Sequence, residues 1–433
     1  MTKNILLKLI ILIICVSLSG NFAYFTLDKK FFSGDSFSYI IPASNLFNGH
    51  GFTDKNYIVE TKRTPGYPLL LTLFMALSLD VEHIIIFQHL INVILAVALL
   101  IVTLKITRNL FIAFLASVIF SIDFPSIYHA NKILSETFFT AILFVTFIML
   151  YYLVATEKQN KNLCILCGLL GGLTALIRPV SFFFFIPSTL YLFITLRSKG
   201  TKLVILFNIC FLLLPSLWII RNYIKVGVAT ISSISDVNIL YYRGGGILAL
   251  REPGDFLLNM KKQREALRKK ANEQLESIYG ANLNKIPHAQ KAKHYSRLGW
   301  EIILKYPFDY IKLTLRGIFM IMFGGNTDAL ALITGFNYKF VKTLVILYTT
   351  ISAFLALLGS KYLFKKNKKF FYLIVLTISY FVILPAGGES DVRFKLPIMP
   401  MYSILIASGL YLSLNYLNIN WFNFNNICSA SHK

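Results

Sequence analysis

Charged residues are scarce in this chain. Only 15% of its 433 residues are charged, and 20 are Asp or Glu, whereas soluble domains carry about 25% charged residues. Hydrophobic residues make up 56% of the chain, and apolar runs close to the length of a bilayer crossing recur from end to end. The composition therefore excludes an ordinary soluble protein and predicts an all-α polytopic membrane protein.

Cysteine, linkers and repeats are also sparse or missing. Five scattered cysteines exclude a disulfide framework, and the pair Cys164 and Cys167 lies inside an apolar run, where packing explains it. We see no internal repeat and no Gly/Ser linker, so residues 1–433 are expected to form one transmembrane domain. The net charge of +23 would suggest nucleic acid in a soluble domain. Much of it lies in short loops between apolar runs, which indicates membrane topology and lipid headgroups, with no nucleic-acid partner.

The apolar runs predict about ten crossings, with both termini in the cytoplasm. The predicted crossings are Ile5–Phe25, Ile84–Leu104, Leu110–Ile127, Thr137–Val154, Leu163–Ile177, Val180–Leu196, Leu203–Ile220, Val341–Phe364, Phe370–Pro385 and Pro397–Leu417. Short basic connections, among them those with Lys105, Lys158 and the KKNKK run at 365–369, fall on one side. That side is cytoplasmic by the positive-inside rule. The first run resembles a signal peptide but continues past Ser19, which favours a retained helix.

Two apolar segments do not fit this scheme. Tyr67–Leu79 is short for a crossing, so we expect an interfacial or re-entrant helix within a first extracytoplasmic loop, 26–83. Phe308–Phe323 is long enough to cross, but a crossing there would put the KKNKK run outside. We therefore expect it to lie along the outer surface, or to dip in and return, within a large outer region at 222–340. The C-terminal helices then occupy 341–417.

Ionisable residues near a bilayer are functional candidates, because holding them there costs free energy. In this chain they gather at the outer ends of the predicted helices and in the outer loops, while the helix midplanes are nearly bare. A conduction path would need polar groups at mid-depth, so the pattern favours a site at the outer face. The residues are Asp35, Arg63, Glu136, Arg178, Arg221, Glu389, Asp391, Arg393 and Lys395.

Taken singly, these residues also have structural explanations. Asp35 could cap the short helix that carries Phe37 and Ile40, and Glu136 could belong to a helix start with Ser135 as N-cap. Arg178 and Arg221 could be anchors whose charged heads reach the interface at helix ends.

Taken in order, the residues form a series of motifs. The first outer loop carries an acid followed by Tyr, Ala, Leu and Gly, which are Asp35, Tyr39, Ala43, Leu46 and Gly49. The later elements are "KRTPGYPLLL" at 62–71, "LSETFF" with Glu136, "LIRPVSF" with Arg178, "PSLWIIRN" with Arg221, and "RFKLPIMP" from Arg393. This series resembles the C-type glycosyltransferases of the protein O-mannosyltransferase and lipid A aminoarabinose transferase kind, a group that includes many bacterial polyprenyl-phosphate-sugar enzymes.

The resemblance implies a helix bundle with interfacial helices and an active site facing the periplasm from the bacterial inner membrane. It implies a polyprenyl-phosphate-sugar donor and Asp35 as the base that deprotonates an acceptor hydroxyl for an inverting attack. A phosphate leaving group makes one base and several cations sufficient. The substrate-binding candidates are Tyr39, Lys62, Arg63, Tyr67, Glu136, Arg178, Arg221, Asp391 and Arg393.

Several alternatives stay open at this point. Several relatives have paired acids in the first outer loop, whereas this chain has Asp35 beside Gly34 and Ser36. No cofactor is therefore certain, and a divalent metal has no supporting ligand cluster. The acceptor could be a lipid, a glycan or a protein. A polysaccharide polymerase or ligase, or a lipid-linked sugar transporter, would also fit the hydropathy.

Overall fold

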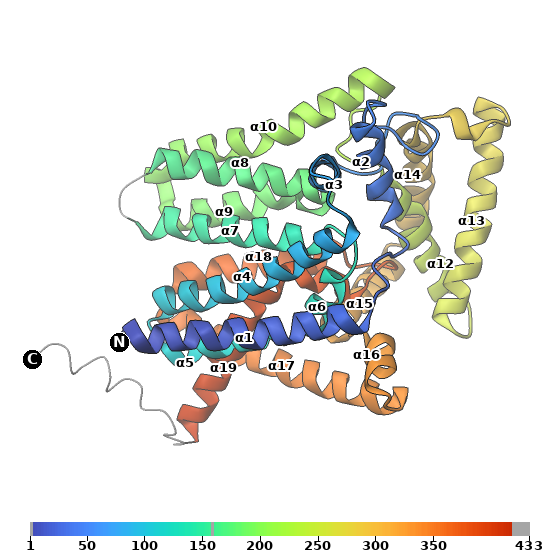
Figure 1. Cartoon of the computed structure of the whole chain (residues 1–433). Helices are drawn as coiled ribbons and strands as arrows, with labels where there is room; N and C mark the ends of the chain where they lie inside the picture. Colours follow the sequence, from blue (N-terminus) through green and yellow to red (C-terminus); the bar gives the residue numbers. More distant parts are fainter. Residues whose placement is uncertain (1–2, 157–159, 418–433) are drawn as a thin grey trace, which may run out of the picture.

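The computed structural model describes residues 3–156 and 160–417. Over these residues the protein is helical, apart from one isolated bridge between Thr53 and Val59, which confirms the predicted all-α membrane fold. Most of the long helices lie side by side with their axes roughly aligned, and the outer segments gather at one end of this bundle (Figure 1).

Each of the ten predicted crossings corresponds to one helix or to two consecutive helices. They are α1 (Lys3–Leu27), α4 (Val81–Thr107), α5 (Leu110–Ser121) with α6 (Phe124–Ala130), α7 (Glu136–Ala155), α8 (Lys161–Ile177), η1 (Pro179–Phe184) with α9 (Phe185–Leu196), α10 (Thr201–Val226), α17 (Tyr338–Lys366), α18 (Lys368–Ile383), and η5 (Val392–Ile398) with α19 (Met399–Tyr416). Large apolar side chains stay exposed along them; Ile94, for example, is 66% exposed and Leu357 67%. Such surfaces require lipid rather than water around them.

Helix length alone gives a smaller number of crossings. Among the described residues, eight helices are long and apolar enough to span a membrane, or nine if α5 and α6 form one bent span. With 17 and 16 residues, α8 and α18 are short for a span, whereas the segment Pro307–Thr334 is long enough.

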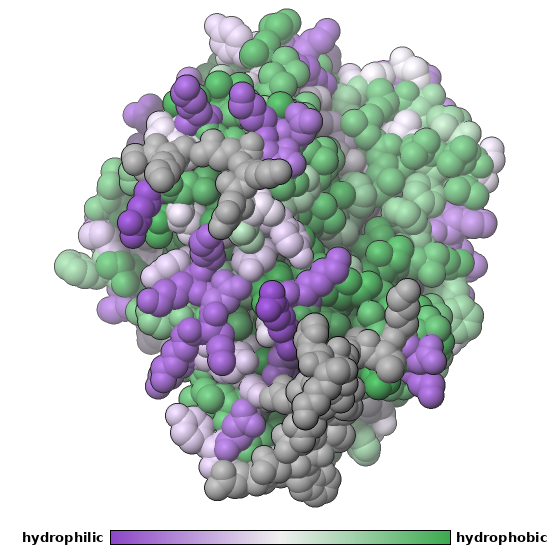
Figure 2. Space-filling view, turned by 90° about the vertical axis from the view of Figure 1, so that its left-hand side faces the viewer, coloured by the Kyte–Doolittle hydropathy of each residue, from purple (hydrophilic) through white to green (hydrophobic). Residues whose placement is uncertain are grey.

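Contacts between distant helices show which ends lie together. Lys369 Nζ donates a hydrogen bond to the Val154 carbonyl (3.1 Å), and Asn367 Nδ2 donates to the Tyr151 hydroxyl (2.8 Å). The turn between α17 and α18 therefore lies beside the C-terminal end of α7, at what we call the Lys366 end of the bundle. Hydrophilic side chains gather over this end (Figure 2). Lys158, one of the basic loop residues, lies outside the described residues.

The opposite end, which we call the Asp35 end, carries the segments predicted from the sequence to lie outside. At this end Arg221, near the end of α10, bonds to the first outer loop, and α17 must begin here because it finishes at the Lys366 end. The segment between them, which contains α15 (Pro307–Phe323) and α16 (Thr327–Thr334), therefore starts and finishes at the Asp35 end. The segment Pro307–Thr334, which contains α15 and α16, is long and apolar enough to cross, but the chain comes back to the Asp35 end after it. The surface or re-entrant placement of Phe308–Phe323 stays a prediction.

A layer of further helices covers the Asp35 end (Figure 1). It consists of α2 (Phe37–Phe47), α3 (Gly66–Ala76), α11 (Ile234–Asn238), η3 (Ile239–Gly244), α12 (Gly245–Leu250), α13 (Phe256–Tyr279), η4 (Leu283–Lys285) and α14 (His288–Lys305). The expected short interfacial segment at Tyr67–Leu79 corresponds to α3.

One predicted crossing is broken. The sequence predicted a single run over Leu110–Ile127, but the structure bends by 49° between α5 and α6. Asp123 accepts hydrogen bonds from the backbone N–H and hydroxyl of Ser126 and so caps a new helix, and Pro125 suits the first turn of a helix. The break turns α6 toward η5, which carries Arg393.

Close backbone contact fixes α19, and with it η5. A Cβ added at Gly359 of α17 would lie 1.9 Å from the Leu405 carbonyl oxygen, and one at Gly409 of α19 would lie 1.8 Å from the Leu355 carbonyl oxygen. Only glycine allows the two backbones to approach this closely.

Candidate active site

Asp35 lies in the loop just before α2, but its carboxylate does not cap that helix. The first residues of α2 have no side-chain cap, and it is the Asp35 carbonyl that accepts from the Ser38 N–H (3.1 Å). The capping explanation of Asp35 is therefore wrong, because both carboxylate oxygens bind arginines.

The two arginines come from distant parts of the chain. Arg63 Nη2 lies 2.7 Å from Asp35 Oδ1, and Arg393 Nη1 lies 2.7 Å from Asp35 Oδ2. The side chains of Asp35 and Arg393 are 35% and 30% exposed, and that of Arg63 is 12% exposed. The three form a partly exposed ion cluster with the carboxylate at its centre.

Arg63 is held by further contacts from α2. Its Nε donates to Ser38 Oγ (2.8 Å) and its Nη1 to the Tyr39 hydroxyl (3.0 Å), and the Tyr39 hydroxyl also pairs with Ser135 Oγ (3.2 Å). All three guanidinium nitrogens of Arg63 are thus engaged. Tyr39, a predicted substrate-binding residue, serves here to orient Arg63.

The arginines set the protonation of Asp35. Partial burial alone would raise the pKa of Asp35, but the charges of Arg63 and Arg393 and their hydrogen bonds outweigh it and lower the pKa to about 2. Asp35 is therefore an anion at physiological pH, and a weak base in this arrangement.

A second ion pair lies beneath this cluster. Glu136, at the start of α7, lies 2.8 Å from Arg178 Nη1, and their side chains are only 3% and 12% exposed. Glu136 also interacts electrostatically with Arg63 and Arg393. The two sequence candidates Glu136 and Arg178 thus form a more deeply buried ion pair, and Glu136 interacts with both arginines of the Asp35 cluster.

The sequence reasoning missed His129. This histidine lies on α6, is buried, and interacts electrostatically with Glu136, Asp391, Arg393 and Arg178. Neither ring nitrogen has a hydrogen-bond partner among the described residues. The sequence did contain a signal for His129, because this ionisable residue follows the apolar run Leu110–Ile127 and lies seven positions before Glu136.

Arg221 is at the Asp35 end but serves the first outer loop. Its guanidinium donates to the carbonyls of Phe52 (3.1 Å) and Glu60 (2.9 Å) and to Asn222 Oδ1 (2.7 Å), and it packs on the Trp218 ring at 4.5 Å. These contacts hold the segment that leads to Lys62 and Arg63.

Lys62 provides a third cation beside the cluster. Among the described residues, its ammonium has no hydrogen bond or ion pair, although Ser232 Oγ donates to its carbonyl (2.6 Å). Burial, and then the charge of Arg63, lower the pKa of Lys62. An unpaired, crowded cation of this kind is well suited to an anionic ligand.

Two other predicted residues have structural roles. Tyr67 is fully buried, donates to Gln88 Oε1 (2.8 Å), and packs edge-on against Tyr39 at 5.2 Å. Asp391 caps η5 by accepting from the Arg393 N–H (2.9 Å). Their roles in substrate binding stay predictions.

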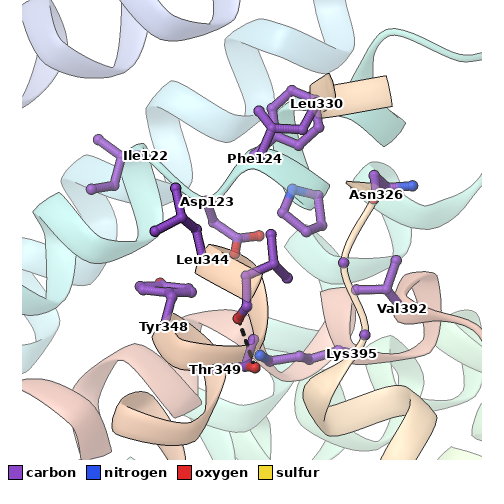
Figure 3. A pocket seen from close by; sticks show the side chains of 14 residues that line it. Ile122, Asp123, Phe124, Asn326, Leu330, Leu344, Tyr348, Thr349, Val392 and Lys395 are labelled. Carbon is purple, nitrogen blue, oxygen red and sulfur yellow. Dashed lines mark hydrogen bonds between the residues drawn. The ribbon is translucent and has the colours of Figure 1, made fainter. Parts of the chain in front are cut away.

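A pocket of about 270 Å³ is lined by the segment next to Arg393 on η5 and by α17 (Figure 3). Val392 and Lys395 contribute from η5, Leu344 and Tyr348 from α17, and Asp123 from the break between α5 and α6. Its walls are mostly apolar, and Lys395, which is only 6% exposed, extends into it.

The Asp35 cluster does not suit a metal ion. Within 3–156 and 160–417, no three His, Cys, Asp or Glu side chains come together in a way that could hold one. Both oxygens of Asp35 face guanidinium groups, and such cationic surroundings repel a divalent cation.

Comparisons with known proteins bear on the fold. Residues 62–219, about a third of the chain, match the dolichyl-phosphate-mannose-protein mannosyltransferase family. The chain is also similar to the oligosaccharyltransferase of Archaeoglobus fulgidus tethered with an acceptor peptide, with a TM-score of 0.54 and 11% identity over 96% of this chain and 50% of that one. The fold is that of the C-type glycosyltransferases.

A second solved structure agrees. The archaeal oligosaccharyltransferase AglB from Archaeoglobus fulgidus, in complex with an inhibitory peptide and a dolichol-phosphate, gives a TM-score of 0.53 and 11% identity over 100% of this chain and 52% of that one. The chain thus spans about half the length of both structures. No curated protein matches it. The predicted resemblance to C-type glycosyltransferases is confirmed at the level of the fold.

Proposed function

We propose that this protein is an integral membrane glycosyltransferase that moves a sugar from a polyprenyl-phosphate donor to an acceptor hydroxyl. The observation that carries the proposal is the ion cluster at the Asp35 end, where one carboxylate is flanked by Arg63 and Arg393 on a C-type glycosyltransferase fold. A solved neighbour with a bound dolichol-phosphate supports a lipid-phosphate donor.

The cations would hold the donor's phosphate. Guanidinium groups bind phosphate oxygens through paired hydrogen bonds, and Arg393 and Lys62 have free donors for them. The donor phosphodiester carries one negative charge, and the departing polyprenyl phosphate monoester carries close to two. The cations therefore stabilise the charge that develops on the leaving group.

Asp35 would supply the base. The acceptor oxygen attacks the anomeric carbon, the bond between that carbon and the phosphate oxygen breaks, and its electron pair goes to polyprenyl phosphate. The acceptor proton passes to Asp35. An attack in line with the departing phosphate inverts the anomeric carbon, and a well-placed base typically contributes about 10²–10⁴-fold in rate.

The outer layer suggests where the acceptor enters. The helices α12, α13 and α14 cover the Asp35 end and belong to the long connection between α10 and α17. Connecting segments on a rigid scaffold commonly carry specificity. One solved neighbour carries an acceptor peptide, which supports keeping a protein acceptor beside the lipid and glycan acceptors as a candidate to test. We infer from the positive-inside rule that the Lys366 end faces the cytoplasm, and we propose that the site faces the periplasm from a bacterial inner membrane.

The test is transfer by the purified protein. Protein reconstituted in lipid nanodiscs is incubated with radiolabelled polyprenyl-phosphate sugars and with candidate lipid, glycan and peptide acceptors. We expect a new glycosidic bond with the anomeric configuration opposite to that of the donor. Movement of the labelled lipid across the bilayer of proteoliposomes that contain the same protein, without any new bond, would instead indicate a transporter. A retained anomeric configuration would reject the direct attack.

A further inference from the structure

The Asp35 cluster has two arginines with very different constraints. We propose that Arg393 is a switch: it occupies Asp35 Oδ2 in the resting enzyme and moves to the donor's phosphate, which frees this oxygen to accept the acceptor's proton. This inference rests on the proposed function and concerns the regulation of the same site.

The first step is that the base is masked. Each oxygen of Asp35 receives a charge-assisted hydrogen bond of 2.7 Å from a different guanidinium group. Such bonds favour the ionised carboxylate and lower its proton affinity, whereas a general base works best when its pKa is near the operating pH. As the cluster stands, Asp35 can bind an approaching hydroxyl but takes its proton poorly.

The second step is that Arg63 is fixed. Its three nitrogens are engaged by Ser38, Tyr39 and Asp35, its guanidinium carbon lies 4.4 Å from the Tyr39 ring centroid, and it is mostly buried. Moving it would break all of these contacts. Arg63 therefore keeps Asp35 oriented through Oδ1 throughout the reaction.

The third step is that Arg393 can leave. Its only side-chain hydrogen bond to another described residue is the one to Asp35 Oδ2, and its Nε is buried without a partner. Its backbone is fixed at the start of η5 by Asp391, while its side chain is the most exposed cation of the ion cluster. A phosphate would offer it paired hydrogen bonds in exchange for the single one that it loses.

The charges around Asp35 agree with this sequence of events. Arg63 and Arg393 face it directly, Lys62 lies nearby, and Glu136 interacts with both arginines from below. Moving Arg393 away and bringing a phosphate anion close both favour protonation of Asp35. After transfer, release of polyprenyl phosphate lets Arg393 return, which expels the proton from Asp35 to solvent. The acceptor is thereby activated only when a donor is in place.

The experiment follows the protonation of Asp35 without requiring turnover. Protein labelled with ¹³C-aspartate in nanodiscs is titrated by infrared difference spectroscopy between pH 4 and 7, with and without polyprenyl phosphate. The Asp35 band is assigned by its loss in Asp35→Asn. Tritiated polyprenyl phosphate measures binding in the same samples.

We expect the Asp35 carboxyl to stay ionised down to pH 4 without the lipid, and to titrate with a midpoint above pH 4 when the lipid binds, which is at least about a hundredfold rise in proton affinity from a pKa of about 2. Arg393→Gln should raise the midpoint without any lipid, and Arg393→Lys, which keeps the charge, should leave it low. Arg251→Gln, which breaks the pair with Asp309 elsewhere in the outer layer, should titrate like the natural protein.

An unchanged midpoint in protein that binds the tritiated lipid would overturn the switch. If that same protein still transfers sugar, the proposed function stands without it. Failure of the lipid to bind, together with an absence of transfer, would reject both proposals.

Discussion

The buried pair of Glu136 and Arg178 allows a quantitative prediction about stability. Arg178→Met should leave the Glu136 carboxylate, which is 3% exposed, without its partner, and removing one member of a buried pair typically costs about 3–5 kcal/mol. Arg393 still interacts with Glu136, so we expect a loss near the lower end, about 3 kcal/mol. The double variant Arg178→Met with Glu136→Gln should recover most of this loss, because it leaves no unpaired charge.

Reversible unfolding in mixed detergent micelles with increasing dodecyl sulfate would measure these free energies as a double-mutant cycle. Arg297→Met, which breaks an exposed pair with Glu301, is the control and should change stability by no more than about 1 kcal/mol. The reasoning fails if Arg178→Met is as stable as the natural protein, or if the double variant is less stable than the single one.

Three further outcomes follow from the structure. Arg221→Ala should loosen the loop at 52–60, because the hydrogen bonds to the Phe52 and Glu60 carbonyls are lost. We expect faster hydrogen exchange in this loop and weaker donor binding. Amide protection in the loop equal to that of the natural protein would refute the role of Arg221 in holding it. Cysteines replacing His50 and Asn282, in a background lacking native cysteines, should react with an impermeant maleimide in spheroplasts, whereas one replacing Lys366 should not; labelling of position 366 would reverse the topology. Burial, and then the charge of Lys62, lower the pKa of His288 to about 4. The neutral form of His288 therefore stabilises the fold above pH 6.5, and this contribution is lost as the pH falls toward 4. Exchange protection of α14 should therefore decline over this range, and His288→Gln should abolish the decline.

The crossings were predictable because apolar length is a local property of the sequence. The prediction of one unbroken crossing over Leu110–Ile127 is wrong because Asp123 and Pro125 lie within this apolar run but begin a new helix.

The contacts of the site could not be read from the sequence. Asp35 and Arg393 are 358 positions apart, and only the packing of η5 against the bundle brings them together. Charge and motif order suggested both residues, but not that they touch. Charge and motif order also could not show whether Arg221 binds a phosphate or donates to backbone carbonyls of the first outer loop. They could not show that Tyr67 is buried against Tyr39.

The most direct test of the central claim is the turnover of Asp35→Asn. Asparagine keeps the size of the side chain but removes its basicity, and Asp80→Asn, at an outer carboxylate that caps α4, is the matched control. If Asp35 is the base, Asp35→Asn protein should express and bind polyprenyl phosphate while its transfer of radiolabelled sugar falls by at least about 10²-fold, and Asp80→Asn should stay close to the natural rate. An Asp35→Asn enzyme that keeps more than half of the natural turnover would remove Asp35 from the mechanism.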